Sequence, residues 1–511
     1  MENLRQKLKI FNYRPLVLIF LGLTAGILLT WFIKVNFAIT LTGIIISSIV
    51  LIFYSILHKK FKYIIIFCIS MILSVGIFST YINSRMHQNL PNMVGMEAQG
   101  EVYSIKNNGT LLNIVIKDVK VNGKNLGYNA RLKYFNTYQS GYVALKEGMV
   151  ISFCINQQEE ISYQDDNKLP NANYIKNNIG ATFTTNSVEV IDNTPNIRFK
   201  LISKIRENLR FGLNNFNGEM IYSAMFGDVN GFNEDLYDAY KGAGVAHLLA
   251  VSGLNVVLIV GILRWLMKKL HIKDWWSAII ISILLLVYTY LCNFSYSIVR
   301  ATIMGIVLLF APLFFSEYDL LSSTCFAGSL ILIVDPIALF DLGALLSFVC
   351  VIGIAMIYPI FNKWTAKIPI SNTIKDGFNI SLATTISTMP LMALYLGYMQ
   401  PVGLLSNIII VPIFSVLFTI AFVVGIISLI FPYICYIMTI INPLFEWVNW
   451  LIIFIANNSK ILVLPSVNFL TVLLFLLFIV FAGKYNLKRG LSKLNLVAIF
   501  GCILTLQMAF I

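Results

Sequence analysis

The sequence predicts a polytopic α-helical membrane protein of about 11–13 spans with a small β-barrel domain inserted outside the bilayer. Of its 511 residues, 58% are hydrophobic and 12% are charged, whereas a soluble chain carries about 25% charged residues. Uncharged runs of about 20 residues recur, and each can cross a bilayer because a helix satisfies its own backbone. One long polar stretch, about 90–240, interrupts them.

Basic residues in short loops orient these spans, since cytoplasmic loops are enriched in Lys and Arg. With the N-terminus inside, three spans at about 15–33, 36–57 and 63–82 place the polar stretch outside. The first run is too long for a cleaved signal peptide, and we expect it to be retained. Ten further spans follow, at about 247–267, 275–293, 298–316, 320–334, 342–361, 378–397, 402–431, 432–456, 466–483 and 494–510.

The run 402–431 is long for one span and contains Pro412. Counted as two helices, it places the basic loop 484–493 outside. We therefore expect one helix, kinked or interrupted near Pro412. The net charge of +13 reflects these cytoplasmic loops rather than a general nucleic-acid surface.

The segment 97–193 is predicted to be a β domain. Residues 101–106 and 131–135 alternate polar and apolar, 110–121 and 150–154 are apolar-rich, and 181–190 closes the series. Asn122 and Gly123 form a strong two-residue hairpin signal. About five short strands with such turns fit a small barrel of the OB-fold kind.

Nine positive and ten negative side chains make this domain nearly neutral. Proteins that bind single strands combine a basic groove with stacking aromatics. Tyr103 and Tyr134 are candidates for stacking, and Lys106, Arg131 and Lys133 for the groove. The alternative is an ordinary barrel with solvated lysines and core aromatics.

Four regions follow: a three-span hairpin region at 1–90, the OB-like domain at 97–193, basic connecting helices at 197–245, and a transmembrane domain at 246–511. Leu201, Ile205, Leu209 and Leu213 recur every four residues among basic ones. They predict an amphipathic helix at the outer membrane surface. Guiding a polyanion is its alternative role.

Polar residues inside spans are costly, so they are candidate functional positions. Most lie in the outer half of the predicted bilayer, where Thr388 with Pro390, and Asn407 with Pro412, are expected to break two spans. Broken helices are tolerated where they line a cavity, which predicts a water-accessible vestibule opening outward. Its candidate residues are His247, Ser252, Gly253, Asn255, Arg300, Asp335, Asp341, Thr388, Pro390, Asn407 and Pro412.

At these positions the sequence resembles the ComEC family of competence proteins. The string AHLLAVSGLNV at 246–256 is similar to the family signature. The strings MFGD at 225–228, RATIM at 300–304, DP at 335–336, LGALLSF at 342–348, TMP at 388–390 and SN at 406–407 support it in order. The segment 168–180 is similar to the end of the family's OB-like domain.

The resemblance implies a multi-pass channel subunit that conducts single-stranded DNA across the bacterial cytoplasmic membrane during transformation. Its partners would be single-stranded DNA, membrane lipid and a separate DNA receptor, nuclease or cytoplasmic motor. His247, Ser252, Asn255 and Arg300 would line or support the outer mouth, or only join helices by hydrogen bonds. No GxxxxGK[ST] is present, so a partner or a gradient would supply energy.

Two departures from the family pattern matter. Asn255 stands where the family commonly has His. Full-length members also carry a metallo-β-lactamase-like domain with an HxHxDH-type cluster, and the four histidines of this sequence form no such cluster. We therefore expect a short form with no metal, no cofactor and no nuclease activity.

Two other functions remain open. One is a transporter or membrane scaffold of unknown substrate derived from the same fold. The other is a membrane-embedded hydrolase that uses Ser252 with His247 and Asp228 or Asp341. The spacing of Ser252 and His247 places them on different helix faces, and the sequence around Ser252 is no GxSxG elbow, which argues against the hydrolase.

Overall fold

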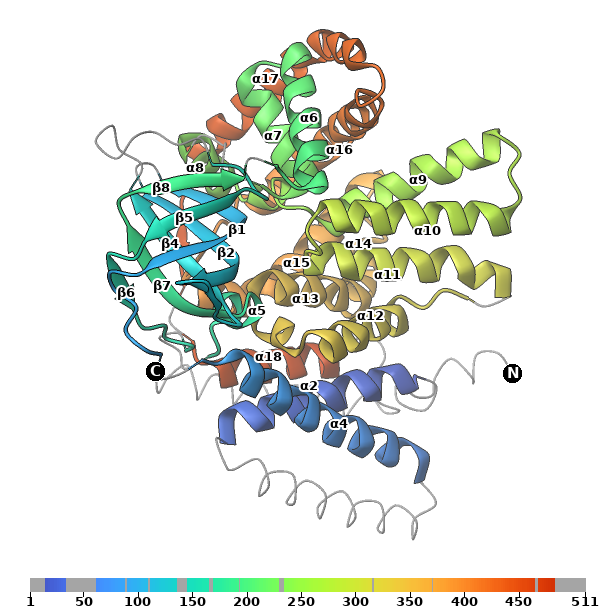
Figure 1. The fold of residues 1–511 in the computed structure, drawn as a ribbon. Helices are drawn as coiled ribbons and strands as arrows, with labels where there is room; N and C mark the ends of the chain where they lie inside the picture. The colour runs from blue at the N-terminus through green and yellow to red at the C-terminus, as the bar shows by residue number, and fades with distance from the viewer. Residues whose placement is uncertain are drawn as a thin grey trace. The chain divides into compact units, whose positions relative to one another are not determined.

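A computed structural model describes residues 14–33, 61–87, 90–108, 111–135, 145–164, 169–192, 194–228, 234–314, 317–369, 371–464 and 467–482 (Figure 1). The chain divides into two compact units. The first, the helical unit, comprises Met1–Phe78, Glu234–Ile420 and Pro443–Ile511, and the second, the sheet unit, comprises Ser79–Asn233 and Ala421–Asn442. Each is described by itself.

The helical unit is built from apolar helices that pack against one another. Helices α9 (Gly253–Lys269), α10 (Asp274–Leu291), α11 (Tyr296–Phe310) and α12 (Leu320–Val334) run side by side in Figure 1. The others in or entering this unit are α2 (Pro15–Ile33), α4 (Phe61–Arg85), α8 (Glu234–Gly242), α13 (Leu342–Met356), α14 (Tyr358–Thr365), α15 (Asn372–Tyr395), α16 (Gly403–Ile427), α17 (Met438–Asn457) and α18 (Phe469–Ala482).

Six helices of the described residues are long and apolar enough to cross a membrane, or seven if the bent pair α13 and α14 counts as one span. They confirm a polytopic membrane protein, but not the predicted 11–13 spans. The expected spans at 36–57 and 494–510 lie outside the described residues. Helices α9 and α12, with 17 and 15 residues, are too short to meet the same length criterion.

The break predicted at Pro390 is wrong, because α15 continues through this proline. The run 402–431 forms one helix, α16, as predicted, and this helix is not interrupted at Pro412. A proline removes only one hydrogen bond from a helix of this length. The hydroxyl groups of Ser387 and Thr388 bond to the carbonyl oxygens of Ala383 and Thr384, one turn back. These polar side chains are therefore satisfied within an unbroken helix.

The sheet unit holds an eight-stranded sheet in which the strands pair in the order β6-β7-β4-β2-β1-β5-β8, with β3 on β2. The strands are β1 (Glu97–Asn108), β2 (Leu111–Val121), β3 (Lys124–Asn125), β4 (Asn129–Phe135), β5 (Val150–Cys154), β6 (Gln157–Glu159), β7 (Ile179–Thr185) and β8 (Val188–Asp192). All neighbours are antiparallel except β4 and β7. Since β6 and β8 do not pair within the described strands, the sheet is not the closed barrel that the sequence predicted, and an OB-like fold is not confirmed.

The hairpin predicted at Asn122 and Gly123 is confirmed. Both residues have positive φ, 48° and 79°, as the two central residues of a type I′ turn require. The turn pairs Val121 with Lys124 and so joins β2 to β3. Alternating inward residues such as Ile114, Leu132 and Phe183 then form the core of the sheet.

The segment predicted to form a basic amphipathic helix corresponds to α6 (Ile197–Gly212), which is followed by the almost wholly buried α7 (Asn215–Phe226). Ile205 and Leu209 are buried, while Lys200 and Lys204 are exposed. Glu219 of α7 is paired with Arg206 and Arg210 of α6, each at 2.5 Å. This ion cluster ties α6 to α7.

Candidate functional site

The segment before α9 makes a close backbone contact with the start of α16. A short 3₁₀ helix, η2 (Ala246–Leu248), precedes α9. Gly244 has φ +74°, and a Cβ there would lie 2.7 Å from Gly403 Cα. Only glycine fits this conformation and this approach. The contact leads the chain into α9 with His247 exposed.

Ser252 is the N-cap residue of α9, and its hydroxyl lies 3.3 Å from Asn255 Oδ1. Asn255 is buried and also hydrogen-bonds to Tyr288 of α10. Both polar residues therefore bind within or between helices. The hydroxyl of Ser252 is directed to Asn255 and not to His247, which disfavours a nucleophile–base pair.

Arg300 lies in α11 and is only 6% exposed. Its Nη1 donates to the carbonyl oxygen of Ser347 in α13, and its guanidinium carbon lies 5.6 Å from the centre of the Phe348 ring. A Cβ on Gly253 would lie 2.9 Å from Arg300 Nη2, so this glycine makes room for the side chain. The Arg300 Nε has no hydrogen-bond partner. Among the described residues no carboxylate pairs with this cation.

Asp335 and Asp341 flank the short helix η4 (Pro336–Phe340). Asp335 accepts a hydrogen bond of 2.5 Å from the Tyr296 hydroxyl, and Asp341 caps α13 by accepting from the backbone N–H of Ala344 at 2.8 Å. Capping by a side-chain oxygen satisfies a free N–H at a helix start. Both carboxylates thus hold helix ends in place.

The remaining vestibule candidates lie on α15 and α16. The Asn407 amide is 3.3 Å from the Ser381 hydroxyl, while Asn407 Oδ1 is buried without a partner. Pro390 is buried, and Pro412 is exposed. These contacts form a second polar group, separate from Arg300 in the contacts that the structure describes.

The two groups are linked by helix packing. Arg300 contacts α13, and α13 packs on α15, where Gly353 faces Ser387. The structure thus joins Gly253 directly to Arg300, and Asn407 directly to Ser381. Of the candidates, Gly253, Asn255, Arg300, Thr388, Pro390, Asn407 and Pro412 lie on α9, α11, α15 and α16.

In the sheet unit, the candidate DNA-contacting residues have different surroundings. Tyr134 is fully buried in the core, so its ring is not available for stacking. Lys117 Nζ lies 3.4 Å from the centre of the half-buried Tyr103 ring. Lys133 is paired with Glu159 at 2.6 Å. Lys106 is exposed.

Arg131 belongs to a polar row that the sequence interpretation missed. Its guanidinium donates to Tyr174 of α5 (Ala172–Lys176) and to Asn113, each at 2.8 Å. Asn113 of β2 stands in register between Lys106 of β1 and Lys133 of β4. Asn113, the one polar residue in the run 111–116, was the signal that could have revealed this face.

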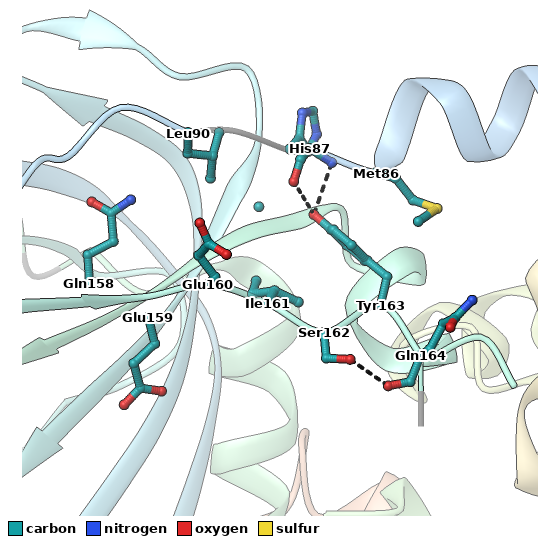
Figure 2. Close-up of a pocket in the computed structure, with 11 residues that line it drawn as sticks. Met86, His87, Leu90, Gln158, Glu159, Glu160, Ile161, Ser162, Tyr163 and Gln164 are labelled. Atoms are coloured by element: carbon teal, nitrogen blue, oxygen red, sulfur yellow. Dashed lines mark hydrogen bonds between the residues drawn. The ribbon is translucent and has the colours of Figure 1, made fainter. Parts of the chain in front are cut away.

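A pocket of about 490 Å³ opens beside β6 in the sheet unit (Figure 2). Figure 2 shows the hydroxyl of Tyr163 directed at the backbone of His87, whose N–H donates to it at 3.0 Å. The same hydroxyl donates to the Ile179 carbonyl at 3.0 Å. Burial raises the pKa of Tyr163, so the phenol stays protonated. None of the predicted site residues lines this pocket.

His, Cys, Asp and Glu side chains of the described residues form no group of three that could hold a metal ion. The exposed carboxylates of Glu159 and Glu160 border the pocket but belong to no such group.

Comparison with known proteins agrees with the motifs around α9 and α11. The family model for competence proteins matches residues 224–489, more than half of the chain. The ComE operon protein 3 of Bacillus subtilis strain 168 is 23% identical over 237 residues, which cover 46% of this chain and 30% of that protein. No solved structure matches. The matched region contains α9, α11, α13, α15 and α16 with the Arg300 site, and the chain belongs to the competence protein family, as its resemblance to ComEC suggested.

Proposed function

We propose that this chain is a membrane channel subunit that conducts single-stranded DNA across the bacterial cytoplasmic membrane. The observation that carries the proposal is Arg300, a buried cation with no carboxylate partner among the described residues, inside the region that matches the competence family. An arginine in a membrane domain is costly unless it serves a pathway or a partner. A phosphodiester carries the opposite charge, and its two unesterified oxygens can accept two hydrogen bonds from the planar guanidinium.

Conduction of a polyanion requires weak repeated contacts rather than one tight site. Arg300 supplies one such contact, and Phe348 and Gly253 hold its guanidinium in place. Ser252 and Asn255 support the same helix start. We assign His247, which is exposed immediately before α9, to the mouth of this path.

A second function is favoured by the sheet unit, because two basic residues of its candidate DNA-binding groove already have partners within the protein. Arg131 bonds to Asn113 and Tyr174, and Lys133 pairs with Glu159. A transporter or membrane scaffold for another substrate would need no free basic groove. A hydrolase has less support, since Ser252 faces Asn255.

The test is complementation of a deletion strain, scored by uptake of labelled DNA and by protein level. The wild-type chain should restore uptake, and Arg300→Ala should reduce it about tenfold, the effect of losing roughly 1.4 kcal/mol of interaction. Arg300→Lys should restore part of it, because the charge remains. Arg264→Ala, at an exposed arginine of the same membrane domain, is the matched control.

If Arg300 only braces the helices, Lys fails nearly as badly as Ala, since Lys lacks the planar fork, and protein level falls in both variants. A deletion strain with undiminished DNA uptake would support the transporter or scaffold and reject the channel.

A further inference from the structure

Residues 264–276, which join the end of α9 to the start of α10, form a strongly basic surface that we call the α9–α10 corner. It contains Arg264, Lys268, Lys269 and Lys273, and the single carboxylate of Asp274. All five side chains are exposed. Among the residues that the structure describes, none of the four cations is paired with a carboxylate. The corner therefore presents positive charge that the protein itself does not neutralise.

Three tryptophans surround these cations. Trp265, Trp275 and Trp276 are between 46% and 62% exposed, although large aromatic side chains normally supply buried packing area. The Lys269 Nζ lies 5.2 Å from the centre of the Trp265 ring, within the range of a cation–π contact. Exposed Trp beside Lys is typical of the headgroup level of a bilayer, where an apolar body and a charged tip are both accommodated.

The corner lies at one end of helices that can cross a bilayer. The segments Asp274–Leu291 and Tyr296–Phe314 are both long and apolar enough to do so. The centre of the Trp275 ring lies 5.7 Å from that of Phe310 and 6.1 Å from that of Phe314, so the start of α10 meets the end of α11, as Figure 1 shows. With 18 residues, α10 is about 27 Å long, close to the roughly 30 Å of hydrocarbon. Its first turn therefore lies at headgroup level.

An exposed apolar stripe on α9 leads to the corner. Leu254, Val257, Gly261 and Trp265 are spaced three or four residues apart and are all exposed. Nothing lies within 4 Å of a Cβ added at Gly261, so the middle of the stripe is open. From Leu254 to Trp265 the stripe is about 17 Å long, roughly the thickness of one hydrocarbon leaflet. An acyl chain fits along it with its headgroup beside Trp265.

We propose that the α9–α10 corner binds an anionic phospholipid. The headgroup phosphate contacts Lys268, Lys269 and Lys273, and an acyl chain lies on the α9 stripe. Basic clusters at the ends of membrane helices attract anionic headgroups, and lysine donates charge-assisted hydrogen bonds to phosphate oxygens. A DNA strand would satisfy the lysines but would not cover the apolar stripe, which favours lipid. The site is separate from Arg300 and does not depend on DNA conduction.

Lipid binding to the purified full chain tests the proposal. In detergent, the chain is titrated with dioleoyl phosphatidylglycerol or with zwitterionic dioleoyl phosphatidylcholine, and bound lipid is counted by native mass spectrometry. The wild-type chain should bind its first phosphatidylglycerol at least about fivefold more tightly, since one lysine at an anionic surface contributes about that factor. Equal affinities would mean that the lysines act only as a topology signal, and would overturn the proposal without any variant.

Two triple variants then locate the site. Glutamine at positions 268, 269 and 273 should bring the affinity for phosphatidylglycerol to within about twofold of that for phosphatidylcholine, because the charge is lost. Arginine at the same three positions should keep the preference, because the charge remains. A glutamine variant that keeps the preference, at a Tm equal to that of the wild type, would contradict the assignment.

The matched control removes three exposed lysines of the sheet unit in one variant, Lys120→Gln, Lys124→Gln and Lys146→Gln. It changes the net charge by the same amount and should leave the preference intact. Loss of the preference in this control would show general electrostatic attraction and overturn the site. Displacement of bound phosphatidylglycerol by a single-stranded oligonucleotide would assign the corner to another polyanion and would likewise overturn it.

Discussion

The environment of Arg300 consists of a backbone carbonyl, an aromatic face and a glycine. The carbonyl of Ser347 and the ring of Phe348 are neutral, so the positive charge is not cancelled. Burial without cancellation leaves a local positive potential inside the helix row. A phosphate that passes the site would therefore be attracted, whereas a neutral solute would not.

At the residue scale, Gly253→Ala should disturb this site without removing the charge. The new Cβ would lie 2.9 Å from Arg300 Nη2, so the end of the flexible side chain must shift. We expect DNA uptake to fall severalfold, less than in Arg300→Ala, at normal protein level. Gly261→Ala on the same helix is the matched control, because nothing lies within 4 Å of its added Cβ. Equal uptake by the two variants would contradict this reading of Arg300.

Glu219→Gln should destabilise the contact of α6 with α7. The Glu219 carboxylate is buried and binds two arginines, so its neutralisation leaves Arg206 and Arg210 without a counter-charge. Because both arginines are partly exposed, we expect a loss of about 1–3 kcal/mol, seen as a lower Tm of the purified chain. Glu207→Gln on the exposed face of α6 should change stability by about 0.5 kcal/mol or less. An unchanged Tm in Glu219→Gln would exclude a stabilising role for the cluster.

Individual site residues were predictable from sequence only where residue type carries the signal. Arg300 was recognisable because a cation inside a span is unusual. Its acceptor, the Ser347 carbonyl, was not, since a backbone oxygen 47 positions away leaves no mark in the sequence. Tyr134 was considered for stacking, but it occupies an inward position of β4, between the outward Lys133 and Phe135.

At the scale of elements, close helix packing depends on small residues. A Cβ on Gly353 of α13 would lie 2.7 Å from Ser387 Cβ of α15. Gly353→Ala should therefore cost about 1–3 kcal/mol by overpacking. Gly377→Ala in α15, where nothing lies within 4 Å of the added Cβ, should stabilise the chain by roughly 0.5–1 kcal/mol. Thermal unfolding in detergent measures both effects. The Tm should fall in Gly353→Ala and rise in Gly377→Ala, and shifts in the same direction would contradict the prediction.

The ion pair of Glu147 with Arg198, at 2.8 Å, links the chain before β5 to α6. Burial raises the pKa of Glu147, Arg198 opposes this shift, and Asp228 adds to it. A carboxyl whose pKa is higher in the folded state loses stability as the pH rises through the interval between its unfolded and folded pKa values. Because glutamine does not ionise, the Glu147→Gln variant does not lose stability in this way as the pH rises. The Tm of the variant minus that of the wild type should thus increase from pH 4 upward, and a constant difference would contradict it.

Sequence pattern predicted elements well where one local signal dominates. The run 15–33 and the run 320–334 coincide with α2 and α12, and 150–154 coincides with β5. The interruptions expected at Pro390 and Pro412 are absent, because each proline removes only one backbone hydrogen bond from a helix of 24 or 25 residues. The prediction that the sheet closes into a barrel was wrong for another reason. The pairing of β6 and β8 depends on short strands, three and five residues long, that carry little periodic signal.

At the scale of the whole molecule, basic residues are distributed unequally between the two ends of the membrane helices. Helix α9 ends in Lys268 and Lys269, and α14 is followed by Lys367. Elsewhere in the helical unit, Gly244 lies against Gly403 at the start of α16, and β9 (Tyr398–Met399) pairs with β10 (Leu462–Val463). The positive-inside rule predicts that the lysine-bearing ends are cytoplasmic. The location of the sheet outside the membrane likewise stays a prediction from the sequence.

The orientation itself can be measured on the same scale. In a Cys154→Ser background, which removes the exposed cysteine of the sheet, Asn122→Cys should react with an impermeant maleimide in intact cells, since its turn is exposed at the edge of the sheet. Lys268→Cys and Lys367→Cys should react only after permeabilisation, because both positions are exposed but belong to loops that are predicted to be cytoplasmic. If the pattern is reversed, the molecule is inverted and DNA entering from outside would meet the lysine ends first. In that case Arg300 would no longer lie near the entrance, and the channel proposal would lose its main residue.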